Sequence, residues 1–329
     1  MRRPRLGFAG VGWIGRQRMQ SIAADDACDV IVVVDESVEA AHNAVVGLTV
    51  APRLCRRFEE ALESNLDGLV IATPSALHAA QAVAALDRGI AVFCQKPLAR
   101  TAAETRTVMA AARANDRLLG VDLSYRWTTG MRRVRDLVQS GALGDIYAVD
   151  LVFHNAYGPD KAWFFDPELS GGGCVIDLGI HLVDLALWTL GFPCIVGASS
   201  RLFARGHPLG DDRTVVEDYA VARLDLESGA VIQLACSWNL SAGRDAVIGA
   251  SFYGPAGGAS LRNVGGSFYD FVAERWIGTR CETLASPPDE WGGRAAVDWS
   301  RRLVDGGRYD PSIEQLGNVA AALDRIYGR

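Results

Sequence analysis

Lysine is nearly absent from this chain. Only Lys96 and Lys161 carry an ammonium group, and arginine supplies the other 31 of the 33 cationic residues. Because a lysine can give up its proton and an arginine cannot, a retained lysine points to chemistry that arginine cannot perform. Lys96 follows the apolar residues 89–92, at a predicted strand end. We therefore expect Lys96 to be functional, with chance retention as the alternative, and Lys161 to be a weaker candidate for a substrate loop.

Positive net charge, cysteine pairs and long apolar runs are also lacking. The net charge of −6 argues against nucleic acid or an anionic membrane surface as the partner. The seven cysteines have no paired spacing, which excludes a disulfide framework and a zinc site and predicts a cytoplasmic location. No apolar run approaches the roughly 18 residues that span a bilayer. Residues 2–15 resemble a short signal peptide, but four glycines and the lack of a cleavage signal favour a first strand.

Length and apolar content predict two domains. With 329 residues, 49% of them hydrophobic, the chain can form two cores of ordinary size. Strand and helix patterns alternate through the first third, with strands at 5–9, 30–34, 68–72, 90–93 and 118–121 and helices at 14–24, 77–88 and 102–115. This alternation is typical of a parallel doubly wound sheet, so residues 1–122 are predicted to form an α/β domain with a Rossmann fold.

Longer strand patterns follow a helix expected at 129–140. They cover residues 146–153, 219–226, 230–238 and 247–253, and Glu227-Ser228-Gly229 joins two of them with hairpin spacing. Residues 123–329 are therefore predicted to form an α+β domain with a largely antiparallel, open-faced sheet. We expect a last helix at 313–327, and the first domain is a candidate for the surface on which it packs. Burial of the open sheet face against a second copy predicts a homodimer or homotetramer.

A glycine-rich turn follows the first strand. Its residues are Gly10, Gly12, Trp13, Ile14 and Gly15. Glycines at this spacing let the pyrophosphate of a dinucleotide approach a helix N-terminus, so this turn is predicted to bind the cofactor. Asp35 ends the second strand, where a carboxylate can accept hydrogen bonds from the adenosine ribose. Glu36 adds negative charge and no arginine follows closely, so NAD is predicted, with NADP as the alternative.

One predicted helix, at residues 174–190, is apolar nearly all round but carries Asp177, His181 and Asp184. Spacings of four and three put these side chains on one face, and buried ionisable groups need partners or a function. The preceding segment 170–173, Ser-Gly-Gly-Gly, allows the backbone to approach another molecule. We therefore expect the three side chains to line a cleft. An ordinary buried hydrogen bond and a metal site are the alternatives.

These motifs, in this order, resemble the Gfo/Idh/MocA family of sugar and polyol oxidoreductases over nearly the whole chain. The resemblance rests on TPSALH at 73–78, QKP at 95–97, SYRW at 124–127 and the helix motif at 171–184. It implies that Lys96, Asp177 and His181 form the catalytic set and that the Lys96–Pro97 peptide is cis. It also implies further cofactor-binding residues: Thr73, Pro74, Ser75, His78, Gln95 and Lys96. Gln95 departs from the glutamate usual in the family, which removes a negative charge beside Lys96.

The resemblance implies hydride transfer between a nicotinamide and a secondary alcohol or ketone of a sugar, cyclic polyol or sugar derivative. Histidine can take and return a proton near neutral pH, so His181 is expected to be the base. Asp177 would orient the imidazole ring or bind a neighbouring hydroxyl group. Lys96 would stabilise negative charge on the reacting oxygen, and no metal is expected.

Further substrate contacts are expected from the second domain. Residues 154–165 mix polar donors with aromatic rings, as a site for a hydroxylated ring would. The candidate substrate-binding residues are Lys96, Arg126, Tyr157, Lys161, Trp163, Asp177 and His181. A loop that only packs its aromatic rings is the alternative for 154–165. Two other functions on this fold also stay open, a redox-silent NAD(P)-binding regulator and an NAD-dependent glycosidase, although the intact catalytic set favours turnover.

Overall fold

The computed structural model describes residues 2–210 and 214–329, and the chain divides into two compact units. The first unit comprises Met1–Ser124 and Gly293–Leu316, and the second comprises Tyr125–Gly292 and Gly317–Arg329. The chain leaves the first unit close to residue 122, where the sequence placed the boundary, but it returns to that unit later. Each unit has its own hydrophobic core.

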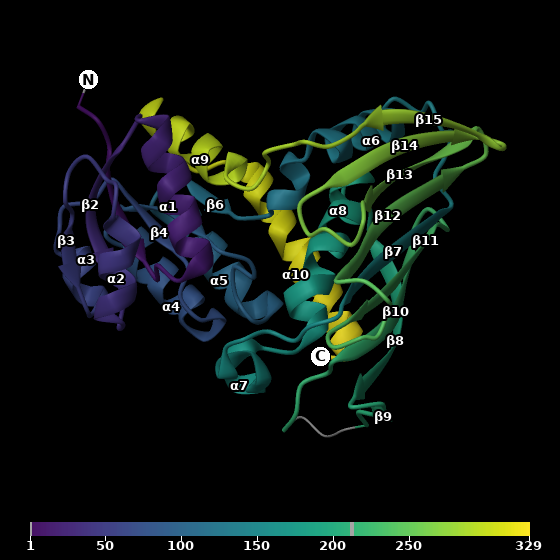
Figure 1. Cartoon of the computed structure of the whole chain (residues 1–329), viewed down its shortest axis with the longest axis horizontal. Helices are drawn as coiled ribbons and strands as arrows, with labels where there is room; N and C mark the ends of the chain where they lie inside the picture. The colour runs from purple at the N-terminus through teal and green to yellow at the C-terminus, as the bar shows by residue number, and fades with distance from the viewer. Residues whose placement is uncertain (1, 211–213) are drawn as a thin grey trace. The chain divides into compact units, whose positions relative to one another are not determined.

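The sheet of the first unit has six parallel strands in the order β3-β2-β1-β4-β5-β6 (Figure 1). Its strands are β1 (Arg5–Ala9), β2 (Asp29–Val34), β3 (Arg53–Cys55), β4 (Gly68–Ile71), β5 (Ala91–Cys94) and β6 (Leu119–Val121). The helices between them are α1 (Trp13–Asp25), α2 (Val38–Val45), α3 (Phe58–Leu62), α4 (Ser75–Leu86) and α5 (Ala102–Ala114). The strand order reverses between β1 and β4, which confirms the predicted doubly wound Rossmann sheet.

The segment that returns to the first unit carries α9 (Arg294–Val304), a helix that the sequence analysis did not assign. The ring of Trp299 on α9 lies 5.7 Å from that of Phe93 on β5, centroid to centroid. The last helix, α10 (Gln315–Tyr327), contributes Val319 and Leu323 to the second core. Leu316, in the first turn of α10, belongs to the core of the first unit, so residues of this helix contribute to both cores.

The sheet of the second unit has nine strands in the order β15-β14-β13-β12-β7-β11-β10-β8-β9. Its strands are β7 (Ala148–Asn155), β8 (Ile195–Ala204), β9 (His207–Pro208), β10 (Tyr219–Leu226), β11 (Val231–Ser237), β12 (Ala246–Gly254), β13 (Gly257–Asn263), β14 (Phe271–Ile277) and β15 (Arg280–Ala285). Among these strands only β7 and β11 pair in parallel. The prediction of a largely antiparallel sheet is confirmed.

One face of the second sheet is covered by helices. Along β10 and β11, buried residues alternate with more exposed ones, so successive side chains point to the core and away from it. The helices α6 (Thr129–Gln139) and α8 (Ile180–Thr189) contact the buried face (Figure 1). The other face carries the half-exposed side chains expected of an open-faced sheet.

The helical stretch Pro167–Thr189 is the central helix of the second unit. By length and composition alone it could cross a membrane, but 83% of its most apolar window is buried inside the protein, as in a core helix. It contains α7 (Pro167–Ser170), a π-helical turn at Val175–Gly179 and α8. Asp177, His181 and Asp184 interrupt its apolar residues.

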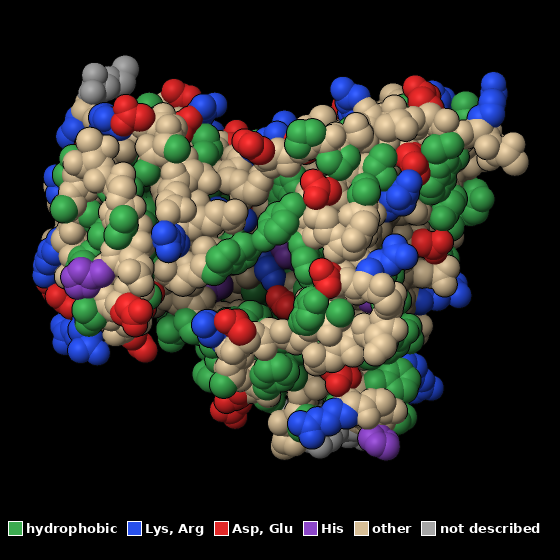
Figure 2. Space-filling model, in the orientation of Figure 1, with side chains coloured by type: hydrophobic (Ala, Val, Ile, Leu, Met, Phe, Trp, Pro, Cys, Tyr) green, Lys and Arg blue, Asp and Glu red, His purple; other side chains and the backbone are tan. Residues whose placement is uncertain are grey.

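Charged side chains of both signs are interspersed over the face of the molecule that Figure 2 shows. Blue and red side chains alternate there, with apolar groups between them. Neither sign forms a single strongly charged patch on that face.

Candidate active site

The glycine-rich loop of the first unit lies where the strand order reverses, between β1 and β4. Gly10 has a φ of +81°, and a Cβ there would lie 2.5 Å from the carbonyl oxygen of Ala72. A Cβ on Gly15 would lie 2.1 Å from the carbonyl oxygen of Gly10. By contrast, a Cβ on Gly12 would have no atom within 4 Å beyond its chain neighbours. The packing of the loop thus requires Gly10 and Gly15, whereas Gly12 leaves space for a ligand.

Helix α1 begins directly after this loop and offers an anion site. Gly12 is its N-cap, no side chain caps it, and its first turn carries no acidic residue. The N–H groups at such a helix N-terminus attract anions. Trp13 is 68% exposed beside it. The residues therefore fit the pyrophosphate of a dinucleotide.

Asp35, which follows β2, ties the second strand to the glycine loop. One of its carboxylate oxygens accepts a hydrogen bond from the backbone N–H of Val11 at 2.9 Å, and the other accepts from Ser37 at 2.9 Å. Its own N–H donates to the carbonyl of Cys55 at 3.2 Å, which sets the end of β3 beside it. The exposed Arg56 and Arg57 follow directly. This pair is about 20 positions after Asp35 in the sequence, so the residues close to Asp35 along the chain do not reveal it.

The loops after β4 and β5 are joined through His78. Its two ring nitrogens lie 2.7 Å from the carbonyl oxygens of Pro97 and Thr73, and the residue is 2% exposed. Burial lowers the pKa of His78, while the two carbonyl oxygens oppose that shift. His78 therefore acts here as a link between two loops. The Lys96–Pro97 peptide is cis, as the resemblance implied.

Gln95 belongs to a buried polar network in the first unit. Its amide donates to the carboxylate of Asp122, which also accepts from the guanidinium of Arg18 at 2.5 Å. Asp122 is 1% exposed and Arg18 is 3% exposed. A glutamate at position 95 would press a second carboxylate against Asp122, and like charges at that distance disfavour ionisation. The side chain that faces Gln95 is thus the carboxylate of Asp122, which directly follows β6.

In the second unit, a buried carboxylate caps the part of the central helix that follows the triple glycine. Glu217 accepts hydrogen bonds from the backbone N–H groups of Gly173 at 3.0 Å and Val175 at 2.9 Å, and from the Tyr327 hydroxyl at 2.8 Å. Burial raises the pKa of Glu217, and these donors oppose the shift. A Cβ on Gly173 would lie 1.9 Å from the carbonyl oxygen of Glu217. The molecule that the triple glycine approaches is therefore the chain itself, which corrects the expectation of an outside partner.

Asp177 and His181 are the partly exposed polar residues of this helix. Asp177 lies in the π-helical turn, and its carboxylate accepts from the indole N–H of Trp238 at 3.0 Å. The imidazole ring of His181 lies 4.8 Å from the ring of Tyr125, centroid to centroid. Within residues 174–187 every other side chain is buried. The structure thus brings two of the three predicted ionisable groups to an accessible face.

Asp184, the third group, has a structural environment. It is 1% exposed, and Arg126 donates to its two carboxylate oxygens at 2.7 and 2.5 Å. Burial raises the pKa of Asp184, and the guanidinium of Arg126 opposes that shift. The expectation that Asp184 lines a cleft is therefore not met, because a bidentate ion pair holds it in the core. In residues 2–210 and 214–329, no group of His, Cys, Asp or Glu side chains could hold a metal ion.

The other predicted substrate residues lie at several places in the second unit. Arg126 donates to Asp184 and stacks 5.6 Å from the ring of Trp188. The Tyr157 hydroxyl donates to Asp245 at 2.6 Å, and the exposed Lys161 lies 3.1 Å from Asp160. The partners found for these residues are protein groups. The ring of Trp163 stacks on Phe164 with centroids 3.8 Å apart.

Three residues that contact this site were missed in the sequence. Trp238 binds Asp177, Tyr125 packs on His181, and Glu217 caps the helix. Trp238 ends a predicted strand, and Tyr125 lies in the family segment 124–127. Both residues therefore belonged to predicted features, but neither was assigned a role in the site. No sequence pattern indicated the capping role of Glu217, because its partners are more than 40 positions away along the chain.

Comparison with known proteins gives the same assignment for both units. Residues 5–123 match the description "Oxidoreductase family, NAD-binding Rossmann fold", and residues 131–260 match "GFO/IDH/MocA C-terminal domain". The chain belongs to the Gfo/Idh/MocA family. It is an oxidoreductase with a Rossmann domain for NAD(P), which confirms the predicted fold, enzyme class and cofactor class.

Relatives of this Gfo/Idh/MocA oxidoreductase include enzymes of sugar metabolism. It is 32% identical to the putative UDP-kanosamine synthase oxidoreductase subunit of Amycolatopsis mediterranei, over 98% of this chain and 95% of that one. It is 28% identical to D-glucoside 3-dehydrogenase of Escherichia coli, over 59% of this chain and 58% of that enzyme. KijD10, a 3-ketoreductase from Actinomadura kijaniata, shares the fold with a TM-score of 0.84 at 19% identity, covering 99% of this chain and 98% of that one.

The open space over Gly12 leads to a prediction about cofactor binding. In Gly12→Ala, the added methyl group contacts no other part of the described chain, so the free energy of unfolding should change by less than about 1 kcal/mol. The same methyl group should raise the NADH dissociation constant about tenfold or more, which corresponds to roughly 1.4 kcal/mol. Urea unfolding and NADH fluorescence titration measure the two effects. Gly10→Ala is the control, because its clash and positive φ should cost stability directly, and unchanged NADH binding by Gly12→Ala would contradict the assignment.

The cap on the central helix leads to a prediction about stability. Tyr327→Phe removes the hydroxyl that donates to Glu217 and accepts from the Ile176 N–H at 3.1 Å. Two buried groups then lose a partner, so urea unfolding should show a loss of about 1–3 kcal/mol. Tyr157→Phe serves as the matched control, because the Tyr157 hydroxyl donates to Asp245 at the surface. Its loss should lower the free energy of unfolding by less than about 0.5 kcal/mol. Equal losses in the two variants would show that Glu217 does not depend on this hydroxyl.

Proposed function

We propose that this oxidoreductase interconverts a secondary alcohol and a ketone on a sugar, cyclic polyol or sugar derivative, with Lys96, Asp177 and His181 as its catalytic residues. One observation carries the proposal. Lys96 is the one residue of 91–99 that is not buried, and Asp177 and His181 are the two of 174–187 that are not buried. Two apolar segments thus each open to solvent only at the side chains that the family motif predicts to react.

In the oxidation direction, His181 accepts the proton of the substrate hydroxyl as the C–H bond of the same carbon breaks. The bound nicotinamide supplies the hydride acceptor. The alcohol loses one proton and one hydride, which leaves a ketone, and the reverse steps reduce it. Asp177 is fixed by the Trp238 indole N–H and would bind the imidazole or a neighbouring substrate hydroxyl. Packing against Tyr125 restricts the orientation of the His181 ring.

Lys96 is the proposed electrostatic partner of the reacting oxygen. Its ammonium group would donate to that oxygen and stabilise the negative charge that develops as the hydroxyl proton leaves, an effect worth about 3 kcal/mol in comparable sites. Hydrogen bonds hold the residues on both sides of Lys96 in the sequence. Gln95 is held by Asp122, and the carbonyl of Pro97 is held by His78.

For the cofactor we propose a preference for NAD over NADP. The carboxylates of Asp35 and Glu36 would repel a 2′-phosphate, whereas Arg56 and Arg57 at the end of β3 would attract one. Asp35 is favoured as the deciding group because it directly contacts the glycine loop. Relatives solved as complexes contain either cofactor, NADH in levoglucosan dehydrogenase and NADP in KijD10.

We further propose a homodimer or homotetramer located in the cytoplasm. The second sheet leaves one face open, and a copy of the chain would bury it. All seven cysteines are free thiols, which fits a reducing compartment.

The two alternative functions predict different products. A redox-silent regulator would bind NAD(P) without turnover, and a glycosidase would cleave a glycoside with no net NADH formation. The accessible His181 and Lys96 favour the dehydrogenase, because a regulator has no need of a base and an acid of this kind. Net NADH formation from an unmodified sugar or polyol separates the dehydrogenase from both.

Substitution of the proposed catalytic residues gives the third prediction. Lys96→Ala should lower kcat by about 100-fold or more, because the stabilised oxygen loses its donor, while NADH affinity stays within a few-fold. In His181→Ala the acidic limb of the pH profile of kcat/KM should disappear. NADH absorbance with a panel of aldoses and cyclic polyols measures both. Arg106→Ala, a substitution on the exposed side of α5, is the control and should leave turnover unchanged.

Retained turnover in Lys96→Ala would remove Lys96 from the chemistry. An unchanged acidic limb in His181→Ala would place the base at another residue.

A further inference from the structure

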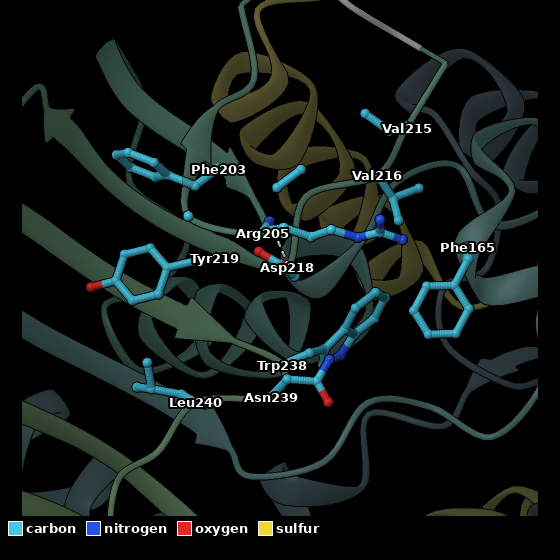
Figure 3. Close-up of a pocket in the computed structure, with 12 residues that line it drawn as sticks. Phe165, Phe203, Arg205, Val215, Val216, Asp218, Tyr219, Trp238, Asn239 and Leu240 are labelled. Carbon is cyan, nitrogen blue, oxygen red and sulfur yellow. Dashed lines mark hydrogen bonds between the residues drawn. The ribbon is translucent and has the colours of Figure 1, made fainter.

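The second unit contains a pocket of about 880 Å³ that no step of the proposed reaction uses. Four aromatic side chains stand around it, from the η2 turn (Ala162–Phe165) and from β8, β10 and the end of β11: Phe165, Phe203, Tyr219 and Trp238 (Figure 3). Pockets that hold drug-sized ligands measure about 300–1,000 Å³. The volume of this pocket lies within that range, so it has room for a sugar ring.

One wall of the pocket is bonded to a proposed catalytic residue. Trp238, which is 3% exposed, donates its indole N–H to the Asp177 carboxylate at 3.0 Å. The ring of Phe165 meets that of Trp238 edge to face, with centroids 5.7 Å apart. A ligand in this pocket would thus lie one side chain away from Asp177.

The pocket is lined by one positively charged side chain, one negatively charged side chain and one neutral amide. They are the guanidinium of Arg205, the carboxylate of Asp218 and the amide of Asn239. Figure 3 shows the Arg205 side chain extended toward Phe165 and Val216. The Asp218 carboxylate accepts the backbone N–H of Arg205 at 2.9 Å. A cation, an anion and an amide among aromatic rings suit a neutral ligand with many hydroxyl groups better than a phosphate, which Asp218 would repel.

The backbone supports a role for two of these side chains. Arg205 has a φ of +51° and Asn239 a φ of +56°, in the left-handed region that non-glycine residues rarely adopt. Arg205 and Gly206 form the tight turn between β8 and β9, where asparagine or glycine is preferred at both positions. Arginine is not favoured by such a turn, so its presence points to a use for its side chain.

We propose that this pocket binds a second sugar ring, so that the substrate is a glycoside or disaccharide in preference to a free monosaccharide. The inference rests on the proposed function, because it places the reacting sugar at Asp177. The aromatic walls would pack against the C–H faces of the second ring. Arg205 and Asn239 would donate to its hydroxyl groups, and Asp218 would accept from one.

The test compares matched sugars on two variants. Isothermal titration of the NADH-loaded protein would use glucose, methyl glucoside, maltose, cellobiose and, as a phosphate-bearing probe, UDP-glucose. NADH absorbance with NAD would follow turnover of the same sugars. The wild type should bind at least one disaccharide about fivefold or more tightly than glucose. Asn239→Gly removes an amide donor, and Arg205→Asn replaces the long guanidinium with a short amide that does not reach as far into the pocket. Each should reduce that preference about fivefold, while glucose binding stays within twofold.

Both variants suit the backbone at their positions, since glycine and asparagine adopt positive φ readily. Thermal unfolding should therefore stay at the wild-type midpoint, which separates lost binding from lost folding. Equal affinity for glucose and both disaccharides, or a preference that neither variant alters, would overturn the proposal. Tighter binding of UDP-glucose than of either disaccharide, lost in Arg205→Asn, would overturn it as well, because the pocket would then recognise a phosphate.

Failure of the proposed function would look different. If Lys96→Ala kept full turnover while the disaccharide preference and its loss in Asn239→Gly were observed, the catalytic assignment would fail and the pocket assignment would stand. If Lys96→Ala lost turnover and no disaccharide preference existed, only the pocket assignment would fail.

Discussion

The hydrogen bonds from the backbone of Gly173 and Val175 to Glu217 fix the part of the central helix that carries Asp177. A buried carboxylate at a helix N-terminus satisfies N–H groups that have no partner inside the helix and interacts favourably with the helix dipole. Glu217 bonds Gly173 and Val175 directly, and the Tyr327 hydroxyl extends the contact to Ile176. Asp177 is the next residue along. Its position is therefore set by a cap whose parts come from three distant segments.

The same contact explains the triple glycine. The carbonyl of Glu217 approaches so closely that a Cβ on Gly173 would lie 1.9 Å away, and a Cβ on Gly172 would lie 2.2 Å from the Tyr327 hydroxyl. Glycine is required for the protein's own packing. In the first unit the reverse holds at Gly12, where the space is open. The two glycine motifs thus serve different purposes, one structural and one suited to a ligand.

Local patterns in the sequence predicted the fold class, most of the first sheet and four of the nine strands of the second sheet. The bounds of β1 and β10 agree residue for residue with the predicted strands, because each is a short apolar or alternating run between clear turns. The elements β3, α2 and α3 were not assigned, since three to eight residues give too little periodicity. Other elements were missed as well, namely β8, β13, β14, β15 and α9. Of these, β8 and β15 bury few side chains, so their apolar pattern is weak. The parallel pairing of β7 and β11 also could not be predicted, because the two strands are far apart in the chain.

For the site, the sequence identified residue types but could not identify their partners. The spacing of Asp177, His181 and Asp184 suggested one continuous polar face, yet Asp184 is paired with Arg126, 58 positions earlier. The π-helical turn at Val175–Gly179 also changes the spacing that an ideal α-helix would give. The sequence indicated that Gln95 removes a negative charge from this part of the site. In the structure, the carboxylate of Asp122, 27 positions later, contacts Gln95. Each of these differences comes from a contact that is distant in sequence.

The most direct test of the account is a crystal structure of the protein with NADH and a bound sugar or polyol. We expect the Lys96 ammonium and the His181 imidazole to lie within hydrogen-bonding distance, about 2.6–3.2 Å, of one substrate oxygen whose carbon faces C4 of the nicotinamide. Lys96 and His181 more than about 10 Å apart in that complex, far beyond any such contact, would contradict the central claim.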